Sequence, residues 1–495
     1  MAESTQALAA LVEGQQIPYG GDRVAIVDAQ LAQRLRPGDR LVVVQQSGDL
    51  LLIPAEEHRL VADAVERASS AVHDLASCSD EAISAFMNGF ADRLEDPAIR
   101  AAIDEANRAD VAHARTRGRS TGRLVLDDAM CSGMIAGLRS WASGPLRRDL
   151  CVEEIEHVGW RVEVRRAPVG VVGFVFEGRP NVFADAVGVV CTGNTTVLRI
   201  GSDALGTARA LMDSALSPAL DAAGLPADTV VLLDSPSRAV GWALFNDDRL
   251  SLAVARGSGS AVAQLGAVAR QSGVSVSLHG TGGAWMVATD AADPQRLTSS
   301  IIHSLDRKVC NTLNVLCLTH ASLPVTVGSA LSALGGRGAI VHVDESTLEA
   351  VCAAGVDLRD DAVIVALGLG EVIVEGELDP GREWEWDETA EVTMMVVEDL
   401  DDAIESFNRH SPRFVASLIS DRSDEHQRFY DGVEAPFVGD GFTRWVDGQY
   451  VFDMPELGLS NWEYGRLLGR NAVLSGDSVH TLRLRTRVSD IDLHR

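Results

Sequence analysis

The feature that most restricts the fold is an alternation that begins near Trp160. Short, strongly apolar runs are separated there by stretches whose apolar residues have helical spacing. The runs lie at 161–176, 195–200, 229–234, 251–257 and 274–280. Strands that alternate with helices form a parallel sheet that helices cover on both faces. The alternation therefore predicts an α/β fold, and a further run at 284–290 predicts a second α/β block.

The remaining segments are assigned by spacing and turn residues. Residues 1–57 hold short β-type runs broken by Pro-Gly-Asp and Ser-Gly-Asp turns, which predicts a small β-rich appendage. Residues 58–280 start with helical spacing and continue into the first α/β block, and residues 281–441 form the second block. Residues 442–495 are expected to return to the first block. They end in SVHTLRLRTRV, an alternating strand able to pair with another subunit.

Composition excludes several classes of protein. The net charge of −28 argues against a nucleic-acid binder and a peripheral membrane protein, both of which need basic patches. The N-terminus lacks the pattern of a signal peptide, and no apolar run has membrane-spanning length. The seven cysteines are odd in number and widely spaced, with no CxxC pair or His/Cys cluster, so no metal site is expected. We expect a reduced, cytoplasmic enzyme.

The stretch DRKVCNTLN (306–314) holds the candidate nucleophile, Cys310. A cysteine attacks as the thiolate, and nearby cations lower its pKa. Arg307 and Lys308 supply two cations within three residues, and Lys308 is the only lysine among 43 basic residues. Two alternatives remain: Cys310 is a buried core residue, as Cys317 is expected to be, or the lone lysine reflects a coding bias that favours arginine.

A second candidate segment is EGRPN (177–181), where a strand ends and a helix begins. Ligands gather at the carboxyl ends of strands in a parallel sheet. Asn181 could donate an amide hydrogen bond to an oxyanion, and Arg179 could hold a carboxylate or a phosphate. The alternative is that Pro-Asn only starts the helix, with asparagine as its cap.

A third segment, ARGSGS (255–260), follows a strand and opens a helix. Small residues at Gly257, Ser258 and Gly259 would let a phosphate approach the backbone N–H groups of the helix. The full GxGxxG spacing is missing, so a tight strand-to-helix connection explains this segment equally well.

Taken in order, EGRPN, LRIGSDA (198–204), ARGSGS, HGTGG (279–283) and VCNTLNVL (309–316) resemble the γ-glutamyl phosphate reductases (glutamate-5-semialdehyde dehydrogenases). These form a branch of the aldehyde dehydrogenase superfamily. The resemblance implies a Rossmann-type cofactor domain, an α/β catalytic domain with the nucleophilic cysteine, and an oligomerising β-flap. It also implies a homo-oligomer that reduces an acyl phosphate with NADPH, NADH remaining possible, and a kinase or ligase that activates the carboxylate.

The same resemblance assigns roles to individual residues. Cys310 matches the nucleophile and Asn181 the oxyanion donor. The turn at Gly257 to Gly259 matches the cofactor site. Arg199, Gly201 and Ser202 match the strand end that faces the adenosine ribose. In the implied mechanism, Arg307 and Lys308 would depress the thiol pKa and compensate the substrate phosphate, which Arg179 could also hold; the family usually carries a small residue at position 308, so Lys308 is this sequence's own feature.

Three departures bear on the expected activity. His279 stands where hydrolytic relatives carry a glutamate that activates water, which suits reductive chemistry. Ser202 replaces a lysine beside the ribose, which weakens the case for NADP over NAD. The family's C-terminal signature is absent, and Trp462, Tyr464 and Leu467 stand there instead. These side chains favour a larger acyl group, or else they pack against the N-terminal appendage.

Two other functions stay open. One is a reductase of another activated carboxylate, such as an aryl or aminoacyl phosphate, an adenylate or a thioester. The other is a non-catalytic partner subunit that keeps the fold for assembly.

Overall fold

The computed structural model describes residues 7–119, 121–144, 148–257, 259–280, 282–445, 455–463 and 466–494. It divides into two compact units. Unit 1 is formed by residues 1–280, 454–458 and 474–495, and unit 2 by residues 281–453 and 459–473. No helix in the described ranges is both long enough and apolar enough to cross a bilayer.

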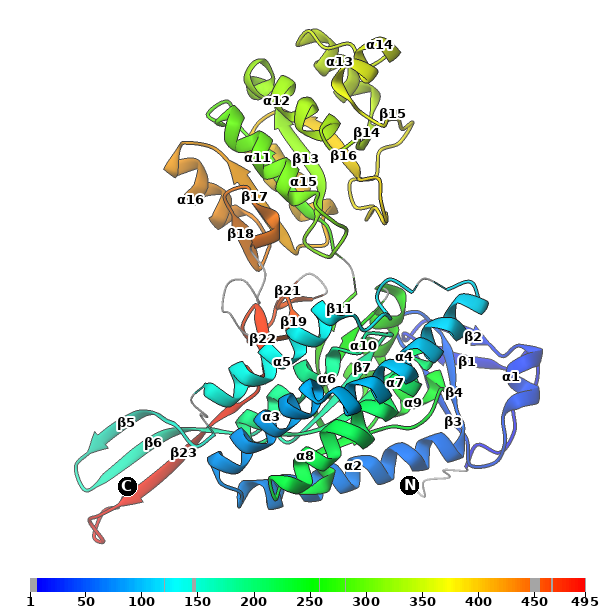
Figure 1. Ribbon diagram of the computed structural model, residues 1–495, viewed down its shortest axis with the longest axis vertical. Helices are drawn as coiled ribbons and strands as arrows, with labels where there is room; N and C mark the ends of the chain where they lie inside the picture. The colour runs from blue at the N-terminus through cyan, green and yellow to red at the C-terminus, as the bar shows by residue number, and fades with distance from the viewer. Residues whose placement is uncertain are drawn as a thin grey trace. The chain divides into compact units, whose positions relative to one another are not determined.

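Unit 1, which contains β7 and β11 in Figure 1, is built on a five-stranded sheet with the order β11-β10-β7-β8-β9. All its neighbouring strands pair in parallel. The strands are β7 (Val171–Phe176), β8 (Thr195–Ile200), β9 (Val230–Leu232), β10 (Leu250–Arg256) and β11 (Ser275–His279). Every residue of β7 and β8 is buried, as a parallel sheet covered on both faces requires.

Successive side chains of β7 enter two different hydrophobic clusters. Val172 and Phe174 join the cluster of the first face, and Val171 and Val175 join that of the second. Helices over the first face are α3 (Asp80–Glu95), α4 (Pro97–Thr116), α5 (Asp128–Ser143), α6 (Val182–Ala186), α7 (Leu205–Leu211) and α8 (Ser217–Ala222). Helices over the second face are α2 (Ala55–Ala76), α9 (Arg238–Phe245) and α10 (Gly259–Gln271).

The N-terminal segment forms two β-hairpins and one short helix. These are β1 (Gln16–Tyr19), β2 (Arg23–Ile26), α1 (Ala29–Arg34), β3 (Arg40–Val43) and β4 (Leu50–Ile53). The β-rich character agrees with the sequence, but the separation at residue 57 does not. Val44, Leu51 and Ile53 join the cluster under α9 and α10, and the Gln45 backbone N–H donates to Gln271 Oε1 at 2.9 Å. The appendage is therefore part of unit 1.

A three-stranded antiparallel flap with the order β23-β6-β5 completes unit 1. It comprises β5 (Cys151–His157), β6 (Trp160–Ala167) and β23 (Thr481–Val488). The C-terminal strand expected from SVHTLRLRTRV thus forms, and it pairs with β6 of the same chain.

Unit 2 contains a seven-stranded parallel sheet with the order β15-β14-β16-β13-β12-β17-β18. Its strands are β12 (Ala284–Ala288), β13 (Leu313–Thr319), β14 (Ile340–Val343), β15 (Glu371–Val374), β16 (Glu391–Val397), β17 (Val415–Ile419) and β18 (Phe437–Gly439). Its helices are α11 (Pro294–Ser304), α12 (Leu323–Gly335), α13 (Glu345–Ala353), α14 (Asp361–Leu367), α15 (Leu400–His410) and α16 (Ser423–Gly432). The two parallel sheets confirm the α/β prediction.

The C-terminal segment differs from the expected return to the first block. Residues 459–473 belong to unit 2, and only residues 454–458 and 474–495 join unit 1. The short strands there are β19 (Glu456–Leu459), β20 (Trp462–Glu463), β21 (Arg466–Leu467) and β22 (Val473–Ser475). No continuous periodicity marks these crossings, because each strand is only two to four residues long.

Candidate active site

Cys310 lies in a short loop of unit 2 between the end of α11 and the start of β13. The loop is closed by its own hydrogen bonds: the Val309 N–H donates to Thr312 Oγ1 at 2.9 Å, and that hydroxyl donates to the Arg307 carbonyl at 2.7 Å. The Cys310 side chain is half-buried. Cys317, in contrast, is fully buried in β13, where burial raises the pKa of its thiol far above the ordinary value. Cys310 is therefore not a core cysteine of the Cys317 kind.

Two glycines pack against the backbone of Cys310. The Gly283 N–H donates to the Cys310 carbonyl at 2.7 Å. A Cβ on Gly282 would lie 2.6 Å from Cys310 Cα, closer than any side chain tolerates. Gly283 also has a φ of +111°, which L side chains rarely adopt. The glycines of HGTGG thus let this turn approach the backbone of the cysteine.

The two cations before Cys310 have different surroundings. Lys308 Nζ lies 2.7 Å from Glu383 Oε1 and 3.8 Å from Glu385 Oε1, and its side chain is 6% exposed. Arg307 is exposed and forms no ion pair with any residue in the described part of the chain. The sequence suggested that both cations act on the thiol and on the phosphate. The structure instead commits the Lys308 charge to two carboxylates and leaves that of Arg307 available.

Arg444 holds the same loop from another side. Its Nε donates to Asp306 Oδ1 at 2.7 Å, and its guanidinium also donates to Asn311 Oδ1. Arg444 is itself buried, and Asn311 directly follows Cys310. Cys310 therefore lies between two residues of its own loop, Asp306 and Asn311, that one arginine bridges.

A second thiol also has a cation beside it. Arg359 Nη1 lies 3.5 Å from Cys352 Sγ, but that thiol donates to Asp357 Oδ1 at 3.3 Å. Arg359 also pairs with Glu345. A neighbouring cation is therefore not unique to Cys310.

In unit 1, Asn181 sits at the residue before α6 but does not cap the helix. Its side chain makes no capping hydrogen bond, and its backbone is already helical, with φ −65° and ψ −16°. Its Oδ1 is buried without a hydrogen-bond partner among the described residues. The capping alternative therefore fails, and the amide is uncommitted.

One turn of helix after Asn181, Asp185 enters a cluster of charged groups that includes Arg179, Arg256 and Glu456. Burial raises the pKa of Asp185 to about 7, against the opposing effect of Arg256. His279, at the end of β11, has its pKa lowered to about 3 by burial and then by Arg256 and Arg179. His279 is therefore neutral at physiological pH and cannot act as a cationic acid.

The residues expected to bind the cofactor lie at the carboxyl ends of the unit 1 strands. Gly201 approaches Gly178 so closely that a Cβ would lie 3.2 Å from its nitrogen, and a Cβ on Gly257 would lie 2.5 Å from Glu177 Cδ. Gly259 is the first residue of α10, and Ser202 opens a 3₁₀ turn. Ser258 lies outside the described residues. Because Gly201 and Gly257 carry no side chain, the turns that follow β8 and β10 can lie close to residues 177 and 178 at this edge of the sheet.

Arg199 shows that this edge fits an anionic group. It is 8% exposed, its Nε has no hydrogen-bond partner, and it forms no ion pair with a described residue. Burial lowers its pKa, with a further contribution from Arg238 and an opposing one from Glu177. Arg238 begins α9, is exposed and also forms no described ion pair. Two arginines without a carboxylate partner suit a phosphate-bearing cofactor.

Sequence reasoning missed several of these residues. Asp185 had a signal, because it is a charge within the otherwise apolar VFADAVGVV and lies four residues after Asn181. Position was the signal for two arginines, since Arg256 is the last residue of β10 and Arg238 is the first residue of α9. Glu383 and Arg444 lie 73 and 134 residues from Cys310, so no local pattern connects them to it.

The chain is similar to known proteins of one family. A family model described as "Aldehyde dehydrogenase family" matches residues 47–308. A γ-glutamyl phosphate reductase of Rhizorhabdus wittichii is 30% identical over 74% of this chain and 81% of its own length. That of Geobacillus thermodenitrificans is 28% identical over 80% of this chain and 91% of its own. The solved γ-glutamyl phosphate reductase of Thermotoga maritima has a TM-score of 0.76 at 22% identity, and covers 88% of this chain and 100% of that chain.

Proposed function

The chain belongs to the aldehyde dehydrogenase superfamily, as the sequence motifs suggested, and from that premise we propose that it reduces an activated carboxylate to an aldehyde. The proposed substrate is an acyl phosphate and the proposed reductant is NADPH. Enzymes of this superfamily are oxidoreductases that use NAD or NADP, which defines the class of reaction. The acyl group and the choice of cofactor belong to the proposal.

The proposed reaction has two chemical steps. The Cys310 thiolate attacks the acyl carbon, the bond to the phosphate oxygen breaks, and the phosphate leaves with a proton from solvent. Arg199 and Arg238 would hold the phosphate-bearing part of NADPH, which would supply the hydride that reduces the thioester carbon and so be oxidised to NADP⁺. The thiohemiacetal oxyanion then expels the thiolate and releases the aldehyde. Asn181 would donate its amide hydrogen to the oxyanion in each step.

The observation that carries this proposal is the setting of Cys310. The thiol is half-buried at a strand start, in a loop that hydrogen bonds and Arg444 hold in place, with the exposed Arg307 three residues earlier. Such a thiol can attack, and such a cation can meet the departing phosphate. His279, which is neutral and half-buried, stands where a hydrolytic enzyme needs a carboxylate base. Reduction therefore fits better than oxidation to an acid.

The cofactor proposal rests on Arg199 and Arg238. The serine at position 202 cannot pair with a 2′-phosphate as an ammonium does. Arg199 and Arg238, which form no ion pair with a carboxylate of the described residues, lie at the same sheet edge and can replace that contact. NADPH is therefore the proposed cofactor, with NADH accepted at lower affinity because a neutral ribose leaves these charges unpaired.

The substrate proposal depends on the C-terminal segment of unit 2. Trp462 packs its indole under the Arg413 guanidinium at 5.1 Å, and Arg470 pairs with Glu463 at 2.6 Å. The Arg470 charge is thus already used, while Leu467 is exposed; Tyr464 lies outside the described residues. These contacts favour an acyl group larger than γ-glutamyl. A carboxylate-activating kinase or ligase would have to supply it.

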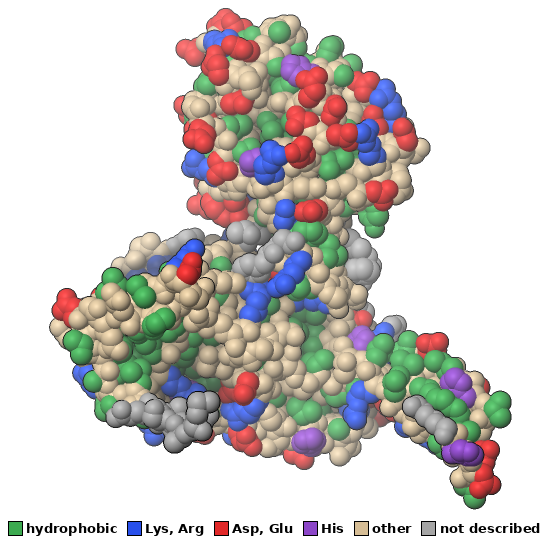
Figure 2. Space-filling model, turned by 180° about the vertical axis from the view of Figure 1, so that it is seen from behind, with side chains coloured by type: hydrophobic (Ala, Val, Ile, Leu, Met, Phe, Trp, Pro, Cys, Tyr) green, Lys and Arg blue, Asp and Glu red, His purple; other side chains and the backbone are tan. Residues whose placement is uncertain are grey.

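Homo-oligomerisation is proposed through the flap. Its strands put charged residues on one face and apolar residues on the other. Figure 2 shows hydrophobic side chains along the flap, at the lower right. Leu482, Leu484 and Val488 are between 54% and 71% exposed, which is unusual for a face that meets only water.

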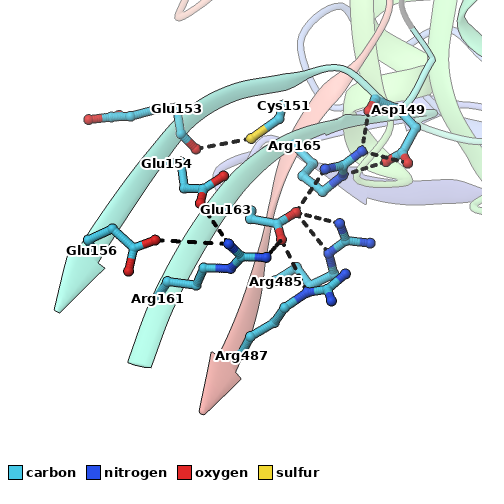
Figure 3. Close-up of polar contacts among 10 residues, drawn as sticks. All are labelled: Asp149, Cys151, Glu153, Glu154, Glu156, Arg161, Glu163, Arg165, Arg485 and Arg487. Atoms are coloured by element: carbon cyan, nitrogen blue, oxygen red, sulfur yellow. Dashed lines mark hydrogen bonds and ion pairs between the residues drawn. The ribbon is translucent and has the colours of Figure 1, made fainter. Parts of the chain in front are cut away.

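The opposite face of the flap is held together by Glu163 (Figure 3). The Glu163 side chain is 4% exposed. Its carboxylate forms ion pairs with Arg165 at 2.8 Å and with Arg487 at 3.2 Å, and it accepts a hydrogen bond from Arg485 Nε at 3.0 Å. The hydrogen bond from Arg485 and then that from Arg165 lower its pKa against the effect of burial. This cluster ties the C-terminal strand to β6, and so fixes the apolar face for a second copy of the chain.

The experiment that tests the proposal follows NADPH oxidation with a panel of acyl phosphates, acyl adenylates and acyl thioesters. Turnover with an acyl phosphate that Cys310→Ala abolishes supports it. Turnover only with adenylates or thioesters would support the second reductase function instead. A third outcome is a stable protein that oxidises NADPH with none of these substrates and shows no preferential alkylation of Cys310. That result would favour the function of a non-catalytic partner subunit.

A further inference from the structure

The Lys308–Glu383 ion pair is attached to the nucleophile by a chain of contacts within unit 2. Lys308 Nζ donates a hydrogen bond to Glu383 Oε1 at 2.7 Å. The Gly282 backbone N–H donates one to Glu383 Oε2 at 2.8 Å. The next residue, Gly283, donates its N–H to the Cys310 carbonyl at 2.7 Å. One carboxylate therefore connects a residue two positions before the cysteine with the glycine turn that packs on it.

Glu383 is itself held by its neighbours. The Trp384 N–H donates to Asn314 Oδ1 at 2.9 Å, and Asn314 Nδ2 donates to the Arg382 carbonyl at 2.8 Å. One side chain at the start of β13 thus binds the backbone on both sides of Glu383. The Trp384 indole also donates to Thr393 Oγ1 at 2.9 Å and stacks on His342. These contacts fix the carboxylate on a segment that has no helix or strand of its own.

From this geometry we propose that Lys308 and Glu383 are positioning residues for Cys310. The pair holds the Gly282–Gly283 turn against the backbone of the cysteine, and so sets where the thiol stands when it attacks. This proposal rests on the proposed function for its kinetic part only.

The charges argue against a direct effect of Lys308 on the thiol. Its ammonium is 6% exposed and meets two carboxylates, Glu383 at 2.7 Å and Glu385 at 3.8 Å. Because the two carboxylates offset the charge of the ammonium, its net electrostatic effect on a third group such as the Cys310 thiol is small. Arg307, which is exposed and has no ion pair with a described residue, remains the cation of this loop that can face an anion.

The two roles predict opposite results for variants of the pair. If Lys308 activated the thiol, Lys308→Met would raise the pH at which Cys310 is alkylated, and Glu383→Gln would lower it by releasing the cation. If the pair positions the turn, both changes break the same chain of contacts. They then lower kcat together, by ~10-fold or more, because small displacements at a reacting group are costly.

The experiment measures amide hydrogen exchange at residues 282–284 in the full chain, which needs no substrate, together with kcat and KM. Lys308→Met, Glu383→Gln and Glu383→Ala should each speed exchange of the Gly282 and Gly283 amides. The double variant Lys308→Met/Glu383→Ala should lose no more kcat than Glu383→Ala alone, and Lys308→Arg should restore most of it. Glu385→Gln is the matched control, since Glu385 touches Lys308 but not Gly282, and it should change neither quantity.

Unchanged exchange in Glu383→Ala would overturn the proposal whatever the activity. So would opposite shifts of the alkylation pH in Lys308→Met and Glu383→Gln, or a loss confined to KM for NADPH. If the wild-type protein reduces no activated carboxylate, the proposed function fails, while the exchange measurement still decides whether the pair positions the turn.

Discussion

Replacing Asp185 with asparagine should stabilise the protein increasingly as the pH rises. Burial raises the pKa of Asp185 to about 7, from the ordinary value of 3.8 for an aspartate. A raised carboxyl pKa means that the folded state binds its proton more tightly than the unfolded state. Below the unfolded pKa the Asp185 carboxyl therefore does not reduce the free energy of unfolding. It reduces this free energy more and more as the pH rises from the unfolded pKa through the folded pKa.

The size of the effect follows from the shift. A difference of about 3 pKa units corresponds to an upper bound of ~4 kcal/mol at pH 8, at 1.36 kcal/mol per unit. Arg256 and Arg179 oppose the shift and Glu456 adds to it, so Asp185→Asn alters their balance as well.

Urea unfolding of the wild type and of Asp185→Asn, at intervals from pH 4 to pH 8, measures the effect. The difference in unfolding free energy should grow in favour of the variant and level off above pH 7. Asp221→Asn removes an exposed carboxylate from the same unit and controls for the change in net charge. A difference between Asp185→Asn and the wild type that does not vary with pH would refute the raised pKa of this half-buried carboxyl.

Four further outcomes are expected. Brief iodoacetamide treatment should label Cys310 before any other thiol, and Cys310→Ala should abolish turnover without unfolding the protein; first labelling of Cys352, which also has a cation nearby, would contradict this. Asn181→Ala should lower kcat by ~10²–10³-fold, the usual loss of one oxyanion donor, and a change in KM alone would argue against that role. Arg238→Gln should weaken NADPH binding by ~10-fold or more in fluorescence titration and leave NADH binding unchanged, whereas Arg209→Gln, whose charge already pairs with Asp234, should affect neither. Glu163→Gln should dissociate the oligomer in analytical ultracentrifugation at neutral pH. The wild type should lose the same stabilisation only as the pH falls below the ordinary carboxyl pKa of ~4.3 and through the lowered pKa of folded Glu163. An unchanged sedimentation profile of the variant would show that the Glu163 cluster does not support assembly.

The α/β fold could be predicted from local sequence, and local motifs also supplied the candidate site residues, whose roles stay a prediction. The period of the apolar runs reports how side chains alternate between the two faces of a strand, and β7 divides its residues between two clusters in this way. Motifs such as EGRPN and VCNTLNVL lie where a strand meets a turn, so the chemistry of Asn181 and Cys310 could be inferred from a few adjacent residues. The γ-glutamyl phosphate reductase relatives confirm the family that these motifs suggested.

Only the tertiary structure decided what each charge does. Arg307 and Lys308 are adjacent and look equivalent in the sequence, yet one is exposed and the other is buried between two carboxylates. The partner that separates them, Glu383, is 75 residues away from Lys308 and enters from the segment before β16. The pKa of Asp185, in helix α6, likewise depends on burial and on Arg256, which lies at the end of strand β10. Local spacing determines which side chains share a face, but the energy of a charge depends on every group that surrounds it, and those groups are brought together only by the folded chain.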